Sequence, residues 1–310
     1  MRIYDPDQAT LEALRDSNIE LMLGVPNSDL QSLANDANAA NTWVTNNVQN
    51  FANVNFRYIA VGNEVSPTNG DADKVSFVLP AMRNIQAALA SAGLQDQIKV
   101  STATYNGLAN PSYPPSHGSF DTGVQSFLDP IIGYLVSIGS PLLVNVYPYF
   151  SFVDMQPDKL SYATFTKTDV EFTDNGLSYS NLFDAIVDAT YAALEKAGAP
   201  NLGIVISESG WPSAGATYAT IDNAKTYNQN LINHVKNGTP KKPGALETYI
   251  FAMFNENLKS PEMRRILGCS SPTNSQLMTL ISLKRSNNQA NMYYTYETVL
   301  VYDSRTNKDN

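Results

Sequence analysis

The amino-acid sequence predicts a (β/α)8 TIM barrel, and three observations lead to this fold class. Short apolar runs alternate along the chain with segments of helical period, a pattern typical of a parallel sheet covered by helices. The apolar runs recur roughly every forty residues, as βα units do. The 310 residues are enough for such a barrel, whose usual length is ~250 residues or more. A doubly wound open sheet is the alternative, but no glycine-rich phosphate loop follows the first apolar run.

Seven apolar runs are interpreted as the strands of this sheet. Several are apolar on both faces, as expected for strands of a parallel sheet that is covered by helices. In chain order, the predicted strands are Arg2–Asp5, Glu20–Pro26, Phe56–Glu64, Gln97–Tyr105, Leu142–Phe150, Gly203–Ser209 and Glu247–Asn255.

Amphipathic segments between these runs predict the helices. In Asn181–Lys196 the apolar residues fall on one face, with Ser180 as the expected N-cap and Gly198 as the stop. Further helices are predicted at Phe77–Ala92, Val124–Ile138 and Asp222–Lys236, and after Thr42.

Composition and charge exclude several classes of function. The formal net charge is −9 and no basic patch is visible, so nucleic acid is not an expected partner. One cysteine and two histidines leave no intrachain disulfide and no expected protein-built zinc site. No apolar run is long enough to span a membrane. The N-terminus has no signal-peptide core, so we expect either a cytosolic protein or a true start that is missing.

The carboxyl ends of the predicted strands carry acids, amides and aromatic residues. In a barrel these ends meet at one mouth, where active sites lie. Such a ring suits sugars, because aromatic faces stack on pyranose rings while amides and carboxylates bind hydroxyls. The residues concerned are Tyr4-Asp5, Pro26-Asn27, Asn63-Glu64, Tyr105-Asn106, Tyr147–Phe150, Glu208–Trp211 and Phe254–Asn257.

Two glutamates at these ends fit the hydrolysis of a glycosidic bond. Glu64 and Glu208 each follow a buried apolar run, where a carboxylate is costly unless it is paired or used. One carboxyl group would protonate the leaving oxygen, and the other would attack the anomeric carbon or activate water. The alternative is a pair of surface glutamates at strand ends.

Other candidates at the mouth have open interpretations. Glu256 either holds Lys259 or a sugar hydroxyl, or forms an exposed ion pair. Trp211 is either a sugar platform or a packed side chain. A serine hydrolase is disfavoured, because the segment Trp211–Gly215 lacks the first glycine of a nucleophile elbow.

The segment Ile204-Val-Ile-Ser-Glu-Ser-Gly-Trp-Pro-Ser-Ala-Gly215 resembles the signature of plant β-1,3-glucanases, glycoside hydrolase family 17. Four further segments resemble this family in order, and the match runs from Arg2 to Glu262. They are Arg2–Asp5, Ala60–Glu64, Asn145–Phe150 and Glu247–Asn257.

The resemblance implies a (β/α)8 enzyme that cleaves internal 1,3-β-glucosyl bonds with retention. It implies Glu64 as acid/base and Glu208 as nucleophile, supported by Glu256 and Lys259, with no metal or cofactor. It further implies a monomeric protein, secreted to the cell wall or vacuole, that acts on callose or fungal walls as a pathogenesis-related protein or allergen. The residues implied along the glucan cleft are Tyr4, Asn63, Asn145, Tyr147, Phe150, Trp211, Phe254 and Asn257.

The chain departs from the family pattern at both ends. It opens at what should be the second strand, so the first strand and helix are expected to be absent and the barrel to have two open edges. Residues 1–262 are assigned to the barrel and 263–310 to an atypical tail. One hypothesis is that the β-prone segment Met292–Tyr302 fills the gap.

We interpret the sequence as that of an endo-acting 1,3-β-glucan hydrolase. We expect Glu64 to be protonated in the resting enzyme because the Glu208 carboxylate raises its pKa. We expect the two carboxyl groups to lie ~5–5.5 Å apart, as in retaining enzymes. The alternatives are a mixed-linkage β-glucan hydrolase of the same family, and an inactive glucan-binding or allergen-like fragment.

Overall fold

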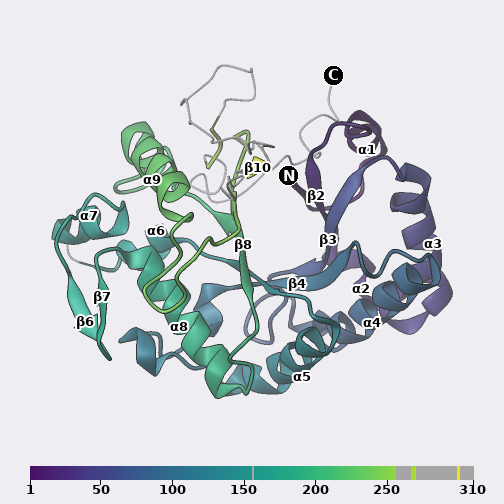
Figure 1. Ribbon diagram of the computed structural model, residues 1–310, viewed down its shortest axis with the longest axis horizontal. Coiled ribbons are helices and arrows are strands. Elements are labelled where there is room, and N and C mark those ends of the chain that lie inside the picture. The colour runs from purple at the N-terminus through teal and green to yellow at the C-terminus, as the bar shows by residue number, and fades with distance from the viewer. Residues whose placement is uncertain (156, 256–266, 270–298, 301–310) are drawn as a thin grey trace, which may run out of the picture.

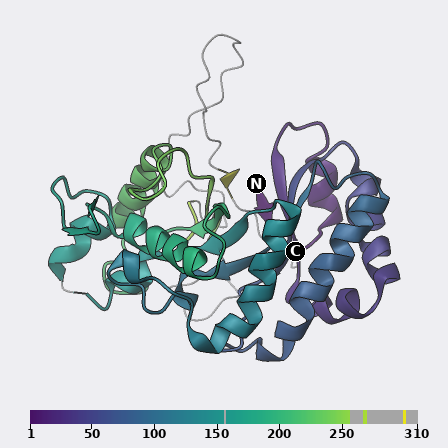
Figure 2. The ribbon, with the colours of Figure 1, turned by 60° about the horizontal axis from the view of Figure 1, so that its bottom comes forward.

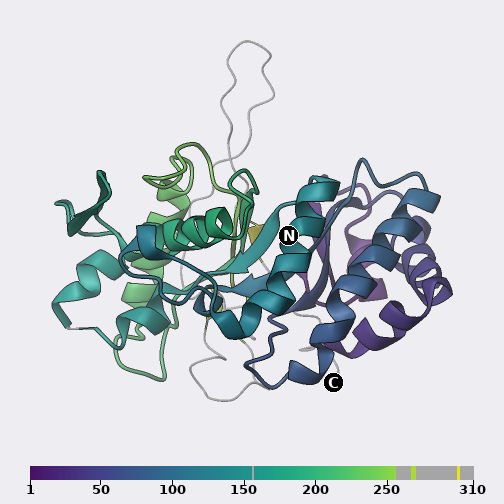
Figure 3. The ribbon, with the colours of Figure 1, turned by 90° about the horizontal axis from the view of Figure 1, so that it is seen from below.

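The computed structural model describes residues 1–155, 157–255, 267–269 and 299–300. Parallel strands run through its centre and helices lie around them (Figure 1). Turned views show the longer helices on the outer side of the strands (Figures 2 and 3). The parallel α/β arrangement predicted from the sequence is therefore confirmed.

The strands pair in chain order, each parallel to the next, and within the described residues the central sheet has eight strands. All seven predicted strands are present. They are β1 (Arg2–Ile3), β2 (Glu20–Val25), β3 (Asn55–Asn63), β4 (Lys99–Tyr105), β5 (Leu142–Asn145), β8 (Ile204–Ser209) and β9 (Thr248–Ile250), and the eighth is β10 (Val299–Leu300).

Five predicted strands end earlier than expected, three of them by only one or two residues, namely β1, β2 and β3. The run Leu142–Phe150 stops as a strand at Asn145, because Pro148 opens the short helix α6 (Pro148–Phe152). Proline is favoured in the first turn of a helix and cannot donate to a strand ladder. The last run ends as a strand at Ile250 rather than Asn255.

The helices include all those predicted. They are α1 (Gln8–Ala13), α2 (Leu30–Asn35), α3 (Ala37–Asn47), α4 (Val75–Ser91), α5 (Thr122–Ile138), α6, α7 (Leu160–Ala163), α8 (Leu182–Lys196) and α9 (Ile221–His234). A separate hairpin of β6 (Phe172–Asp174) and β7 (Leu177–Tyr179) lies at the edge of the molecule (Figure 1). Among the described residues, no helix is both long and apolar enough to cross a membrane.

The N-cap of α8 differs from the prediction. The cap is Asn181 and not Ser180, because the Asn181 side chain accepts a hydrogen bond from the backbone N–H of Asp184 at 2.8 Å.

Alternation along the strands divides the buried residues into two layers. On β2, Leu21, Leu23 and Val25 pack in the large cluster between sheet and helices, whereas Met22 belongs to a smaller cluster. That smaller cluster also takes Tyr58 and other strand residues, and it fills the inside of the barrel. Because the strands pack against the helices on one face and against each other inside the barrel on the other, their sequences are apolar on both faces.

The gap between β9 and β1 is partly filled by later parts of the chain. β10 pairs with β9 in parallel, Val299 opposite Tyr249 and Leu300 opposite Ile250. All three views place β10 beside the N-terminus (Figures 1–3). The rest of the segment Met292–Tyr302 lies outside the described residues, so its filling of the gap stays a hypothesis.

Candidate active site

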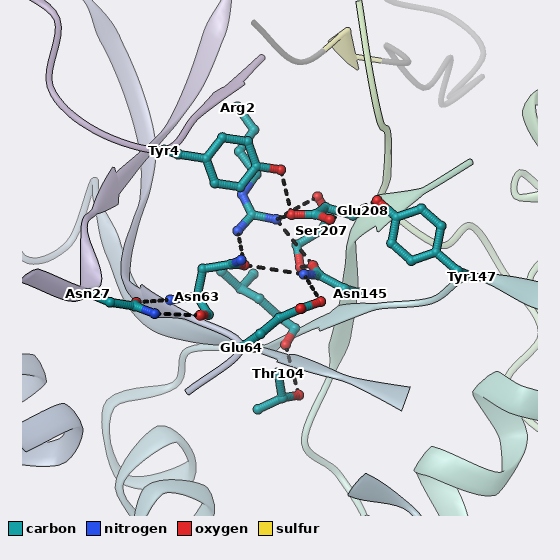
Figure 4. A network of polar contacts seen from close by, with 11 residues as sticks. Arg2, Tyr4, Asn27, Asn63, Glu64, Thr104, Asn145, Tyr147, Ser207 and Glu208 are labelled. Atoms are coloured by element: carbon teal, nitrogen blue, oxygen red, sulfur yellow. Dashed lines mark hydrogen bonds and ion pairs between the residues drawn. The ribbon is translucent and has the colours of Figure 1, made fainter. Parts of the chain in front are cut away.

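The two candidate glutamates lie at the same end of the sheet. Glu208 is the last residue but one of β8, and Glu64 directly follows β3. Their side chains point toward one network of polar contacts, built from strands that are far apart in the sequence (Figure 4). The structure therefore brings together the two carboxyl groups that the sequence singled out.

Hydrogen bonds to the backbone fix the chain around Glu64. Gly62 and Glu64 both have positive φ, 77° and 54°, a region that is costly for a residue with a Cβ. The Asn27 side chain pairs with both polar backbone groups of Asn63, accepting from its N–H at 2.8 Å and donating to its C=O at 2.9 Å. Asn69 donates to the Glu64 carbonyl. These contacts turn the Glu64 side chain off the strand end and into the network.

Three side chains donate hydrogen bonds to the Glu208 carboxylate. Arg2 and Tyr4 donate to Oε1, at 2.9 and 2.5 Å, and Tyr147 donates to Oε2 at 2.8 Å. Glu208 is 6% exposed and Arg2 is 1% exposed. A carboxylate this buried is stable as an anion only when it is paired, and Arg2 supplies that pairing.

The Arg2 guanidinium stays charged in this setting. Its Nη1 also donates to Asn145 Oδ1 and to the Ser207 carbonyl, and its Nη2 donates to Asn63 Oδ1. Burial opposes the charge, but electrostatic interactions with Tyr4, Glu208, Tyr147 and Glu64 outweigh it and raise the Arg2 pKa.

The two tyrosine hydroxyls stay protonated. Burial, followed for Tyr147 by the charge of Glu208, raises the Tyr147 pKa well above its ordinary value. Burial also raises the Tyr4 pKa well above its ordinary value, although Arg2 opposes this. Both hydroxyls therefore serve Glu208 as neutral hydrogen-bond donors.

Asn145 links the two carboxyl groups. Its Nδ2 donates to Glu64 Oε1 at 2.9 Å, and its Oδ1 accepts from Arg2 at 3.2 Å and from the Ser207 hydroxyl at 2.7 Å. Glu208 is charge-paired with Arg2, and the Asn145 amide connects this pair to Glu64. The arrangement places two carboxyl groups from distant strands in one hydrogen-bond network.

Six of the residues that the sequence assigned to the site share this network: Tyr4, Asn63, Glu64, Asn145, Tyr147 and Glu208. Phe150 lies at its rim, 38% exposed, with its ring centroid 5.7 Å from that of Tyr147. Phe254 is half-buried. Glu256, Asn257 and Lys259 lie outside the described residues.

Trp211 does not offer a surface to a sugar in this structure. Its side chain is 0% exposed, with its ring centroid 5.0 Å from that of Tyr149 and 5.5 Å from that of Tyr227. Its indole N–H donates to the Tyr218 carbonyl at 3.0 Å. The cleft position expected for Trp211 is therefore wrong, and the packed alternative is the observed one.

Sequence reasoning did not assign Arg2 and Ser207 to the site. The only signal for Arg2 is a basic residue inside a short apolar run. Ser207 directly precedes Glu208, but nothing local marks it, because Asn145 is 62 residues away in the sequence. Among the described residues, no group of three or more acidic, histidine or cysteine side chains is arranged to hold a metal.

Comparisons with known proteins agree with this geometry. The model of the glycosyl hydrolases family 17 matches residues 1–280. A glucan endo-1,3-beta-glucosidase of Vitis vinifera is 64% identical over 262 residues, covering 84% of this chain and 76% of that protein. A glucan endo-1,3-beta-glucosidase of Nicotiana tabacum, a basic vacuolar isoform, is 52% identical over 275 residues, covering 88% of this chain and 74% of that protein.

Solved structures show the same fold. A beta-1,3-glucanase and allergen of Cryptomeria japonica pollen superposes with a TM-score of 0.87 at 48% identity, covering 90% of this chain and 89% of that one. One of two plant beta-glucan endohydrolases with distinct substrate specificities gives 0.86 at 42% identity, covering 90% of each chain. The barrel predicted from the sequence is confirmed, and the chain belongs to the glycosyl hydrolases family 17.

Proposed function

We propose that this protein hydrolyses internal 1,3-β-D-glucosidic bonds in 1,3-β-glucans such as callose, laminarin and fungal wall glucan. The observation that carries the proposal is that two carboxyl groups, one on β8 and one directly after β3, meet in one hydrogen-bond network at the barrel mouth. Glu208 is bound by an arginine and two hydroxyls, while Glu64 contacts the neutral amide of Asn145. The names of the relatives supply the linkage.

In the proposed mechanism the two glutamates work in two steps. Glu208 attacks the anomeric carbon, and Glu64 gives its proton to the leaving glycosidic oxygen. Glu64, now ionised, takes a proton from water, which attacks the glucosyl–enzyme ester and releases the sugar with retained configuration. The hydrogen bonds from Arg2, Tyr4 and Tyr147 align the Glu208 carboxylate for attack, and they stabilise its negative charge when it leaves the sugar.

The substrate is proposed to bind across the open mouth. Tyr147 and the exposed ring of Phe150 offer aromatic faces for the glucosyl rings, while the half-buried Asn63 offers an amide to the hydroxyls near the bond that breaks. Asn145, expected along the glucan, is 0% exposed and directs its amide to Glu64 and Asn63, so it holds these residues rather than the sugar. Glu256 and Lys259 keep their proposed supporting roles in catalysis, and Phe254 and Asn257 their proposed places along the glucan.

A mixed-linkage 1,3-1,4-β-glucan is the second candidate substrate. The solved plant endohydrolases with distinct substrate specificities favour keeping it, because one of them superposes on this chain nearly as well as the pollen glucanase does. Both polymers would present a β-linked glucosyl unit to the same two carboxyl groups, so the choice between the linkages depends on residues farther along the chain of sugars.

Reducing-sugar release from laminarin tests the function, beside release from mixed-linkage glucan. Wild type should act on laminarin, and Glu208→Gln should lose at least about 10³-fold, because the nucleophile is absent. Preference for the mixed-linkage polymer would shift the proposal to the second candidate. Binding of insoluble glucan without any release would instead identify a non-catalytic glucan-binding protein.

We further propose that the protein acts as a monomer in the cell wall space or the vacuole. Vacuolar isoforms among the relatives support this location. Fractionation of the tissue that expresses the protein, followed by activity measurement in each compartment, tests the location.

A further inference from the structure

We propose that Ser207 is a positioning residue, which orients the Asn145 amide and through it sets how readily Glu64 takes up and releases its proton. The inference rests on the proposed function, in which Glu64 is the acid/base. It concerns a residue that does not contact Glu64 itself, and whose own side chain is 0% exposed.

The contact arises from strand pairing. Asn145 ends β5 and lies opposite Glu208 on β8, at a register shift between the two strands. Ser207, one residue before Glu208, turns its hydroxyl to Asn145 Oδ1 at 2.7 Å (Figure 4). This is the shorter of the two bonds to that oxygen, because Arg2 donates to it at 3.2 Å.

These two donors decide which way the amide faces. A guanidinium can only donate, so Arg2 requires the oxygen of Asn145 on its side. The NH2 group then faces Glu64 Oε1 at 2.9 Å and Asn63 Oδ1 at 3.2 Å. The reversed amide would set NH2 against the guanidinium and oxygen against the carboxyl group. Arg2 thus determines which way the amide faces, and Ser207 makes the shorter hydrogen bond to the same oxygen and so adds a second constraint on its position.

The amide acts on an acid that other charges also influence. The charged and titratable groups that interact with Glu64 from the neighbouring elements include Arg2 and Tyr4 from the first strand segment, and Tyr147 after β5. Glu208 shares the same network from β8. A hydrogen bond donated by Asn145 favours the ionised form of Glu64. Loss of that bond would favour the protonated form and leave the carboxyl group less well aimed.

The same strand offers a matched control. Ser209 is also 0% exposed and also flanks Glu208, but its hydroxyl contacts the Tyr227 hydroxyl at 2.6 Å on α9, away from Asn145. Ser207→Ala and Ser209→Ala each delete one buried hydroxyl from β8. Only Ser207→Ala should change the titration of the proposed acid/base, Glu64.

The decisive measurement is the titration of the Glu64 carboxyl carbon by 13C NMR, assigned by its loss in Glu64→Gln. In Ser207→Ala the titration should move to higher pH, and in Ser209→Ala it should stay in place. The basic limb of the kcat/KM profile on laminarin should move with it, and kcat/KM should fall about tenfold. A Glu64 titration that is unchanged in Ser207→Ala overturns the inference.

A double-mutant cycle tests the route through Asn145. If Ser207 acts through this amide, adding Ser207→Ala to Asn145→Ala should not move the Glu64 titration further. An additional shift of similar size in the double variant contradicts the route. Should Ser207→Ala fail to fold, Ser207→Cys keeps a weaker donor, and it should shift the titration less but in the same direction.

The titration also separates this inference from the proposed function. A wild-type protein that releases no sugar would refute the proposed function, yet the Glu64 titrations would still support or refute the role of Ser207.

Discussion

The two ends of the barrel each hold a glutamate in the same set of donors. At the carboxyl ends of the strands, Glu208 Oε1 accepts from Arg2 and Tyr4, and Oε2 accepts from Tyr147. At the opposite end, where β9 begins, one oxygen of Glu247 accepts from Arg57 and Tyr58, and the other accepts from Tyr249. An arginine and two tyrosines therefore do not by themselves make an active site.

The difference lies in burial and in the second carboxylate. The side chains of Arg2 and Glu208 are 1% and 8% exposed, whereas those of Arg57 and Glu247 are 40% and 24% exposed. Arg57 also pairs with Glu20 at 2.8 Å, so the two carboxylates at the opposite end of the barrel share one cation. At the carboxyl ends of the strands the second carboxyl group, Glu64, is instead connected to the Arg2–Glu208 pair through the amide of Asn145. Hydrolysis with retention needs two carboxyl groups that face one reacting bond.

The largest expected contrast is in stability when each arginine is removed. Arg2→Met leaves a buried carboxylate without its cation, and should lower the free energy of unfolding by about 3–5 kcal/mol. Arg57→Met breaks an exposed cluster, and should cost no more than about 1 kcal/mol. Urea unfolding of both variants measures the two losses. Equal losses would mean that burial does not distinguish the two ends.

Sequence patterns revealed the strands and the two glutamates, because these depend on local periodicity and on a charge at the end of an apolar run. They did not reveal the Arg2 cluster, whose partners lie 61 to 206 residues away and meet only when the barrel forms. Trp211 shows the same limit. Its position after Glu208 placed it near the mouth, but whether an aromatic ring stacks on a sugar or packs inside depends on neighbours such as Tyr149 and Tyr227.

A third buried carboxylate shows what happens when hydroxyl and amide donors act without an arginine. Asp188 on α8 is 0% exposed, and accepts from the Tyr179 hydroxyl at 3.0 Å and the Lys241 N–H at 2.9 Å. Burial raises the Asp188 pKa to about 6, the nearby charge of Asp184 adds to the rise, and the hydrogen bonds only partly oppose it. Asp188 thus has hydroxyl and amide donors like those around Glu208 but, among the described residues, lacks a paired arginine, and burial raises its pKa.

The raised pKa makes the Asp188 contribution to stability depend on pH. The folded protein binds this proton more tightly than the unfolded chain, so the stabilisation is full below about pH 4 and is lost as pH rises through about 6. The loss at neutral pH amounts to about 3 kcal/mol at most. Asp188→Asn should therefore be more stable than wild type at pH 7, and should gain little or nothing at pH 4. Urea unfolding at both pH values measures the gain, and an equal gain at both would contradict the assignment.

The smallest expected contrast separates the two tyrosines that bind the second carboxylate oxygen at each end. Tyr147→Phe deprives Glu208 Oε2 of its donor, which helps to hold the nucleophile ionised and aimed, and should lower kcat/KM on laminarin about tenfold. Tyr249→Phe makes the same deletion at Glu247 Oε1, where no reaction is proposed, and should leave kcat/KM unchanged while costing about 1 kcal/mol of stability. Steady-state kinetics and urea unfolding of both variants decide the matter. A matching fall in activity for Tyr249→Phe would show that the Glu247 cluster influences the mouth through the barrel interior, and the two ends would then have to be treated as one coupled system.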